Sequence, residues 1–140
     1  MEATETLIEL EALRALKARY FRCVDTKAWV DYAELFEPDV TVDLPNDGEG
    51  YAWRDREVFI ADTAQALEGV ITVHHGHMPE LELTSPTTAR GIWAMQDILR
   101  YPEDARRITG YGHYHETYVK KDGRWRIATL KLTRLSLEIT

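Results

Sequence analysis

The sequence predicts an α+β domain, with helices first and a curved, mostly antiparallel sheet after them. Apolar residues recur at helical spacing in three separate stretches between residues 6 and 67, whereas from residue 71 onward apolar and polar residues alternate as they do in strands. Three of the expected strands run for about 12 to 15 residues, well above the usual strand length. Strands that long must curve. We therefore expect three N-terminal helices to pack on the concave face of the sheet and to enclose a pocket.

Each of the three expected helices has a residue that can cap its first turn. The caps, in chain order, are Thr6, Asp25 or Thr26, and Asp55. The residues expected to end or stop the helices are Val24, Pro38 and Gly69. The first helix has the clearest signal, because Thr6 and Glu9 form a capping box ahead of one apolar face.

The strands follow from alternation and from turn residues. A short strand is expected at residues 40–44, followed by a loop over residues 45–50. Pro79 interrupts the alternation that begins at residue 71, so it breaks the ladder or forces a bulge. Lys121-Asp122-Gly123 is a hairpin signal. The remaining strands are expected at residues 71–77, 81–83, 88–99, 108–120 and 124–139.

Length and composition limit what the chain can be. One domain over residues 1–140 fits a length of 140 residues with 44% hydrophobic content. The net charge of −7 argues against nucleic acid or an anionic membrane as a partner. No apolar run approaches the roughly 18 residues of a membrane span. Cys23 is the only cysteine, which excludes an internal disulfide, and we expect a reducing, cytoplasmic setting.

The candidate catalytic side chains stand at alternating strand positions. Neighbouring residues of a strand face opposite sides of the sheet, so His74 and His75 cannot both point into the core. Trp93, Met95 and Asp97 share one face of their strand. If that face is concave, the Asp97 carboxylate lies in apolar surroundings, where such groups are paired, protonated or functional. The alternative is that Asp97 reaches solvent near the strand end.

These residues also have structural interpretations. Asp25 stands at a helix junction, where Asp is often a cap, and His74 alone is more often a hydrogen-bonded structural residue than a base. Tyr20 can be a core residue with a solvated hydroxyl. Four further histidines have no assigned role: His75, His77, His113 and His115. The first two have the spacing of metal ligands on a strand, but no third ligand is specified, so we expect a sheet surface or a subunit contact and no metal.

Four motifs stand in order along the chain: Tyr20 to Trp29 with Asp25, Leu35 to Val40, Val73-His74-His75, and Tyr118 to Trp125 with Asp122-Gly123. Together they resemble the SnoaL-like branch of the nuclear transport factor 2-like superfamily, over nearly the whole chain. The resemblance implies a cone-shaped α+β barrel without a metal or an organic cofactor. It is greatest to the lyases of the superfamily, which include scytalone dehydratases, hexachlorocyclohexane dehydrochlorinases and bile acid 7α-dehydratases.

The resemblance also implies site residues. In those lyases an Asp at the end of the first helix holds a His on the sheet, and that pair matches Asp25 and His74. Tyr20 and Asp97 match further site positions of the bile acid enzymes. Additional histidine, asparagine and serine groups of scytalone dehydratases have no match in this chain. The residues implied to line the cavity are Trp93, Met95, Tyr114, Val42, Leu130 and Leu132, with Arg134 as a pocket cation.

The predicted function is a cofactor-independent lyase that acts on a small cyclic or aromatic molecule. His74 would take a proton from carbon, Asp25 would orient it, and Tyr20 or Asp97 would donate a proton. One alternative is an isomerase or a polyketide-type cyclase, which Asp97 as the base would favour. Another is a non-catalytic small-molecule-binding domain.

The chain is also expected to form a homo-oligomer. An apolar stripe on the outward sheet face requires cover, which a dimer or a trimer would supply. The stripe consists of Ile92, Ala94 and Ile98.

Overall fold

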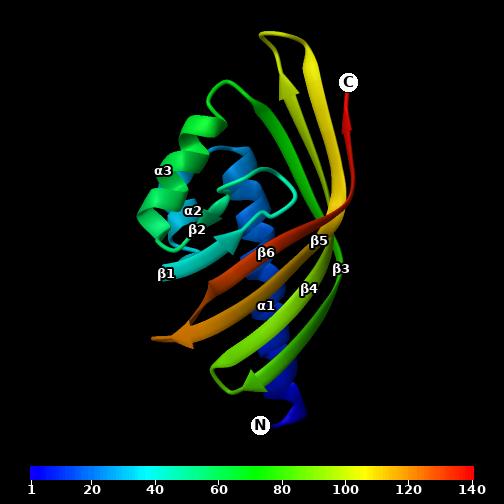
Figure 1. The fold of residues 1–140 in the computed structure, drawn as a ribbon. Coiled ribbons are helices and arrows are strands. Elements are labelled where there is room, and N and C mark those ends of the chain that lie inside the picture. The colour runs from blue at the N-terminus through cyan, green and yellow to red at the C-terminus, as the bar shows by residue number, and fades with distance from the viewer.

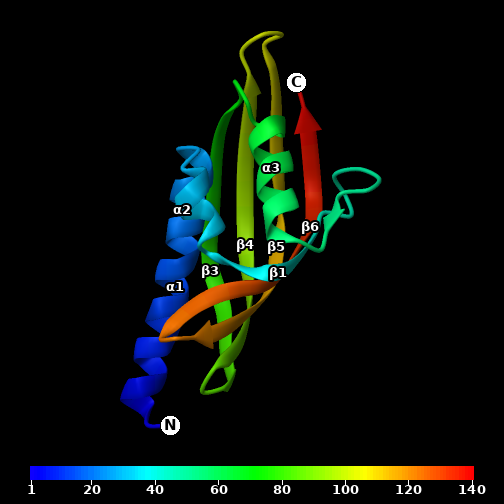
Figure 2. The ribbon, with the colours of Figure 1, turned by 90° about the vertical axis from the view of Figure 1, so that its left-hand side faces the viewer.

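The computed structural model describes residues 1–140 as three helices and one six-stranded sheet. In chain order the elements are α1 (Ala3–Asp25), α2 (Trp29–Ala33), β1 (Phe36–Asp43), β2 (Ala52–Trp53), α3 (Arg56–Ala66), β3 (Ile71–Ser85), β4 (Thr88–Tyr101), β5 (Arg106–Lys121) and β6 (Arg124–Ile139). The strand order is β2-β1-β6-β5-β4-β3, and only the β1–β6 pair is parallel. The three helices lie on one side of the curved sheet (Figures 1 and 2), which confirms the predicted fold class.

The helix boundaries differ from the prediction at two caps. Helix α1 begins at Ala3 without a side-chain cap, because Ala3 and Glu5 before Thr6 are good helix formers. Helix α2 follows Ala28, again without a side-chain cap, so neither Asp25 nor Thr26 caps it. The third prediction is confirmed, since the Asp55 carboxylate accepts the Val58 backbone N–H at 3.0 Å. None of the helices combines the length and the apolar character that a membrane crossing requires.

The strands follow the predicted pattern closely. Strand β1 is longer than expected, because the short α2 frees Phe36 and Pro38 to join the sheet. The two expected pieces around Pro79 form one strand, β3, with a bulge between His77 and Glu80 that confirms the predicted irregularity. A two-residue turn with positive φ joins β5 to β6, as its hairpin signal predicts.

The inner face of the sheet packs against α1 with the predicted alternation. Trp93, Met95 and Asp97 of β4 are buried, whereas Ile92 and its outward neighbours are only half-buried. At Gly76 of β3, an added Cβ would lie 2.5 Å from the ring of Phe21, so this glycine allows α1 to approach the sheet. The core therefore forms between α1 and the strand residues of one parity.

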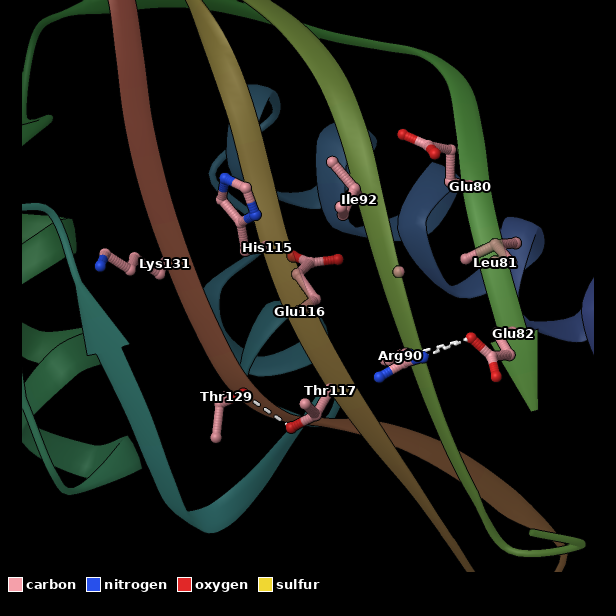
Figure 3. Close-up of a pocket in the computed structure, with 11 residues that line it drawn as sticks. Glu80, Leu81, Glu82, Arg90, Ile92, His115, Glu116, Thr117, Thr129 and Lys131 are labelled. Atoms are coloured by element: carbon pink, nitrogen blue, oxygen red, sulfur yellow. Dashed lines mark hydrogen bonds and ion pairs between the residues drawn. The ribbon is translucent and has the colours of Figure 1, made fainter. Parts of the chain in front are cut away.

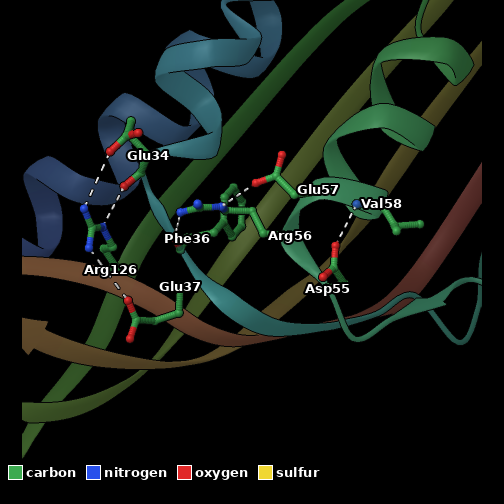
Figure 4. A network of polar contacts seen from close by, with 8 residues as sticks. All are labelled: Glu34, Phe36, Glu37, Asp55, Arg56, Glu57, Val58 and Arg126. Atoms are coloured by element: carbon green, nitrogen blue, oxygen red, sulfur yellow. Dashed lines mark hydrogen bonds and ion pairs between the residues drawn. The ribbon is translucent and has the colours of Figure 1, made fainter.

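Polar contacts fix β1 between β6 and α3 (Figure 4). The Arg126 guanidinium donates to the Glu34 carbonyl at 3.1 Å and lies 3.9 Å from the Glu37 carboxylate. From the other side, Arg56 at the start of α3 donates to the Phe36 carbonyl at 3.0 Å. These contacts hold α3 at the end of the barrel where the cavity described below is found.

The outer sheet face carries a shallow groove of about 640 Å³ (Figure 3). Its lining is mostly polar, and one exposed ion pair crosses it, between Arg90 and Glu82 at 2.7 Å. None of the predicted catalytic residues lines this groove.

Candidate active site

A histidine and an aspartate meet between the end of α1 and the start of β3. His74 Nδ1 lies 2.7 Å from one carboxylate oxygen of Asp25, and the His74 backbone N–H donates to the other oxygen at 2.9 Å. The Thr72 hydroxyl donates to the first oxygen, also at 2.9 Å. An ionised carboxylate only accepts hydrogen bonds, so in neutral His74 the proton stands on Nδ1 and leaves Nε2 free as a base.

The geometry does not support helix capping by Asp25. The backbone amides of Lys27 and Ala28, which a cap at this position would bind, donate instead to the carbonyls of Val24 and Cys23. All three hydrogen bonds of the Asp25 carboxylate go to β3. The carboxylate therefore orients a side chain of the sheet.

An apolar cavity of about 370 Å³ lies between the sheet and the helices. Of its 23 lining residues, 17 are hydrophobic. The predicted site residues in its wall are Tyr20, His74, Asp97, Tyr114, Val42, Leu130, Leu132 and Arg134. Trp93 and Met95 face inward but do not line the cavity, because the sheet below it is covered by α1. Asp25 lies behind His74 rather than in the wall.

Strand register places the polar residues of the wall in one row across the inner face. His74 of β3 is paired with Asp97 of β4, which is paired with Gly110 of β5. Directly paired residues have Cβ atoms about 5 Å apart, so His74 and Asp97 are close neighbours. An added Cβ at Gly110 would collide with the Arg134 guanidinium and the Asp97 carboxylate. The glycine thus provides the space through which Arg134 reaches Asp97 from β6.

Arg134 binds two carboxylates at once. It donates to both oxygens of Asp97, at 2.9 and 3.0 Å, and to both oxygens of Asp47, at 2.5 and 3.1 Å. Burial opposes the charge on the guanidinium, but the hydrogen bonds with Asp97 and Asp47 outweigh it and raise the pKa of Arg134. Asp47 lies in the loop between β1 and β2, so this cluster fixes the loop at the edge of the cavity.

The Arg134 cluster also bears on the predicted role of Asp97. Both of its oxygens accept hydrogen bonds from a cation, which is how an ionised carboxylate is held. Tyr20, in contrast, keeps its proton, because burial and the nearby Tyr114 raise its pKa well above the ordinary value. The geometry therefore favours Tyr20 over Asp97 as a proton donor to a bound molecule.

Replacing Arg134 by methionine is expected to destabilise the protein by about 3 kcal/mol, because it leaves the buried Asp97 carboxylate without its cation. Urea unfolding followed by circular dichroism measures the change. The matched control is Arg90→Met, which removes an ion pair whose side chains are 64% and 58% exposed and should leave the unfolding free energy close to wild type. Equal losses of unfolding free energy in Arg134→Met and Arg90→Met would contradict the interpretation that Arg134 stabilises the buried Asp97 carboxylate.

Two groups near the site were not predicted from the sequence. Thr72 is the second partner of Asp25, and a buried ion pair joins Lys17 of α1 to Glu116 of β5 at 2.6 Å. A signal for the ion pair was present, because Lys17 interrupts the apolar face of the first helix and Glu116 shares a strand face with Tyr114.

The remaining histidines stand on the outer side of the sheet. They are His75, His77, His113 and His115, of which His115 Nε2 lies 3.1 Å from the Thr133 hydroxyl oxygen. No group of three His, Cys, Asp or Glu side chains is arranged as a metal site. His74 is therefore the one histidine that lines the cavity.

Comparisons with known proteins agree with this fold. Residues 5–131 match the SnoaL-like domain family. A probable cyclase of Gibberella zeae is 27% identical over 129 residues, which cover 85% of this chain and 86% of the relative. A solved structure of a putative scytalone dehydratase of Novosphingobium aromaticivorans is 22% identical, with a TM-score of 0.89 over 98% of this chain and 91% of that chain. A hexachlorocyclohexane dehydrochlorinase of Novosphingobium barchaimii is 18% identical, with a TM-score of 0.84 over 99% of this chain and 94% of that chain.

Proposed function

Because the chain belongs to the SnoaL-like domain family, within the nuclear transport factor 2-like superfamily, we propose that it is a cofactor-independent lyase. The reaction is the loss of water, or of a comparable leaving group, from a small cyclic or aromatic molecule. One observation carries the proposal: His74 is oriented by a carboxylate behind it and lines an apolar cavity that Tyr20 also lines.

His74 is the base of the proposed reaction. Its Nε2 removes a proton from a carbon next to an electron-withdrawing group, and the C–H electron pair forms the new double bond. Asp25 stabilises the imidazolium that results and keeps the ring in place. The leaving oxygen departs with the electron pair of its bond to carbon and takes a proton from Tyr20, so water is released. Proton transfer from His74 to Tyr20 restores both residues.

The cavity favours a flat, largely apolar substrate. Its volume of about 370 Å³ suits a small ring system, and its hydrophobic lining leaves few polar groups to fix the orientation. The polar groups stand in one row with Arg134 at its end, so a carbonyl or hydroxyl oxygen of the substrate is expected to face that row.

Elimination from cyclic β-hydroxy ketones tests the proposal. A panel of such compounds, with one to three rings, is incubated with the protein, and the conjugated product is detected by its absorbance and by a mass decrease of one water. We expect turnover by the wild type, turnover lowered by about 10²–10⁴-fold in His74→Ala, and no change when a metal chelator is present. Turnover at the wild-type rate in His74→Ala, or turnover that the chelator abolishes, would contradict the mechanism.

A cyclase or isomerase is the second candidate. It is favoured by the relative of Gibberella zeae, whose name is probable cyclase. The ion pairs of Asp97 with Arg134 count against the version in which Asp97 is the base. A product of unchanged mass from a linear or cyclic ketone would favour this candidate, and tight binding without conversion would favour a binding domain.

We also propose that a second copy of the chain covers the outer sheet face. One row across this face has an acidic residue at one end, a basic residue at the other and Ile92 between them (Figure 3). A copy turned about an axis parallel to the strands brings opposite charges together, so the row is self-complementary. The row consists of Glu80, Ile92, His115 and Lys131.

Light scattering at micromolar concentration is expected to give about 32 kDa, twice the 16.2 kDa of the chain. Ile92→Lys should shift this mass toward the monomer. The control Val30→Lys, at an 81% exposed position of α2, should not change it. A monomer mass for the wild type would refute the proposal.

A further inference from the structure

A fully buried ion pair lies below the floor of the cavity. Lys17 and Glu116 have no exposed side-chain area, and their charged atoms are 2.6 Å apart. The second Glu116 oxygen accepts the Tyr118 hydroxyl at 2.6 Å, and that hydroxyl in turn accepts the Trp93 indole N–H at 3.0 Å. Neither charged residue lines the cavity.

The Lys17 ammonium lies between two aromatic rings that belong to the cavity wall. Its Nζ is 3.4 Å from the ring centre of Tyr20 and 3.7 Å from that of Tyr114. Cations are attracted to the faces of such rings, and the attraction is larger where water is excluded. The two rings also contact each other edge to face, with centres 5.8 Å apart. The positive charge is thus separated from the cavity only by these two rings.

Stability alone does not account for this pair. Two charges lose their hydration on burial, and well-packed hydrophobic residues in place of a buried ion pair are often neutral or stabilising. The same two elements, α1 and β5, are also joined by a second ion pair, Glu9 with Lys120 at 2.7 Å, which remains partly exposed. The buried pair differs from the second one in its position below Tyr20 and Tyr114.

We propose that Lys17 is a positioning residue of the active site, and that Glu116 holds it there. The ammonium fixes the rings of Tyr20 and Tyr114 and stabilises the negative charge that develops on the Tyr20 oxygen as its O–H bond breaks. The proton goes to the leaving oxygen, and the electron pair stays on the tyrosine until His74 returns a proton. This inference rests on the proposed lyase function and adds a group that touches no substrate.

The proposal predicts a dependence on pH. Burial lowers the pKa of Lys17 to about 8, although Glu116 opposes the shift. The ammonium is therefore present at neutral pH and is lost as the pH rises through about 8. The groups facing it are Glu116 and Tyr114 of β5 and Tyr20 and Phe21 of α1. The Glu116 carboxylate also accepts the Tyr118 hydroxyl of β5. The pKa values of these tyrosines are all raised by burial, so none of them ionises in this range.

The test replaces both charges together, as Lys17→Met with Glu116→Gln, so that neither is left buried alone. We expect kcat to fall by about 10-fold to 100-fold with KM little changed, and the decline of kcat above pH 8 to disappear. The control removes the second pair, Glu9→Gln with Lys120→Met, and should alter neither kcat nor its pH profile. Near-ultraviolet circular dichroism checks that both double variants keep the native packing.

A measurement without substrate runs in parallel. Tyrosine labelled with ¹³C at Cζ gives one resonance per residue, and Tyr20→Phe identifies that of Tyr20. In the wild type this resonance should shift as the pH passes through about 8, and in the Lys17→Met/Glu116→Gln variant it should not. An unchanged pH response would overturn the inference, whether or not any substrate is converted. An unchanged kcat, with His74→Ala still inactive, would overturn it while the proposed function stands.

Discussion

Replacing His74 by alanine is expected to lower turnover by about 10²–10⁴-fold, the usual contribution of a positioned general base. The substitution removes the nitrogen that takes the proton, and no other titratable side chain replaces it. Asp97, which is paired with His74 across the sheet, cannot take over as the base because it is hydrogen-bonded to Arg134. The fold should survive, because His74 lines a cavity instead of filling the core. Steady-state kinetics together with thermal unfolding measure the two quantities.

The adjacent histidine supplies a matched control. His75 stands next to His74 on the same strand but points to the outer face, where it is exposed. His75→Ala should therefore retain wild-type kcat and KM. If the two variants lost activity equally, the effect would come from the strand as a whole and His74 would not be the base.

The sheet was predicted well because its signals are local. Alternation along β4, β5 and β6 fixes which residues face inward, and the Asp122-Gly123 turn fixes the register of β5 against β6. Helix ends depend on weaker preferences. Thr6 has the side chain of a cap, yet the helix extends past it to Ala3, because favourable residues on both sides allow one more turn.

The contact between His74 and Asp25 was expected from the family resemblance. The alternation of side chains along β4 correctly predicted that Asp97 lies on the inner face of the sheet. Sequence patterns could not predict the contacts between segments that are far apart in the sequence. Nothing in the sequence indicates that Asp47, in a loop, meets Arg134 of β6, or that both oxygens of Asp97 are occupied. These contacts depend on the closing of the barrel, which brings β6 beside β1.

Sequence patterns also could not predict in full which residues line the cavity. Alternation predicts that Trp93 points inward, and it does, but the depth at which a helix covers the sheet is a tertiary property. Phe21 of α1 fills the space that Gly76 leaves open beside Trp93, so the open volume begins above this level. Inward orientation is therefore necessary for a contact with substrate but does not establish one.

Replacing Asp25 by asparagine is expected to lower kcat by about 10²–10⁴-fold with little change in KM, because Asp25 does not line the cavity. The carboxylate accepts three hydrogen bonds, from the ring and backbone of His74 and from Thr72. An amide has one accepting oxygen and one NH₂ group. If its oxygen faces the ring, its NH₂ group opposes the His74 backbone N–H, donor against donor.

If the amide turns the other way, its NH₂ group donates to Nδ1 of His74, and the ring proton moves to Nε2. The imidazole then presents an N–H to the cavity and is no longer a base. Kinetics and ¹⁵N NMR of the His74 ring measure both consequences. Thr72→Val removes the hydroxyl that donates to the Asp25 carboxylate but keeps the pair of Asp25 and His74, so its loss of kcat should be smaller than that of Asp25→Asn. Asparagine caps helices as well as aspartate does, so a silent Asp25→Asn would contradict the pair and return Asp25 to a structural role.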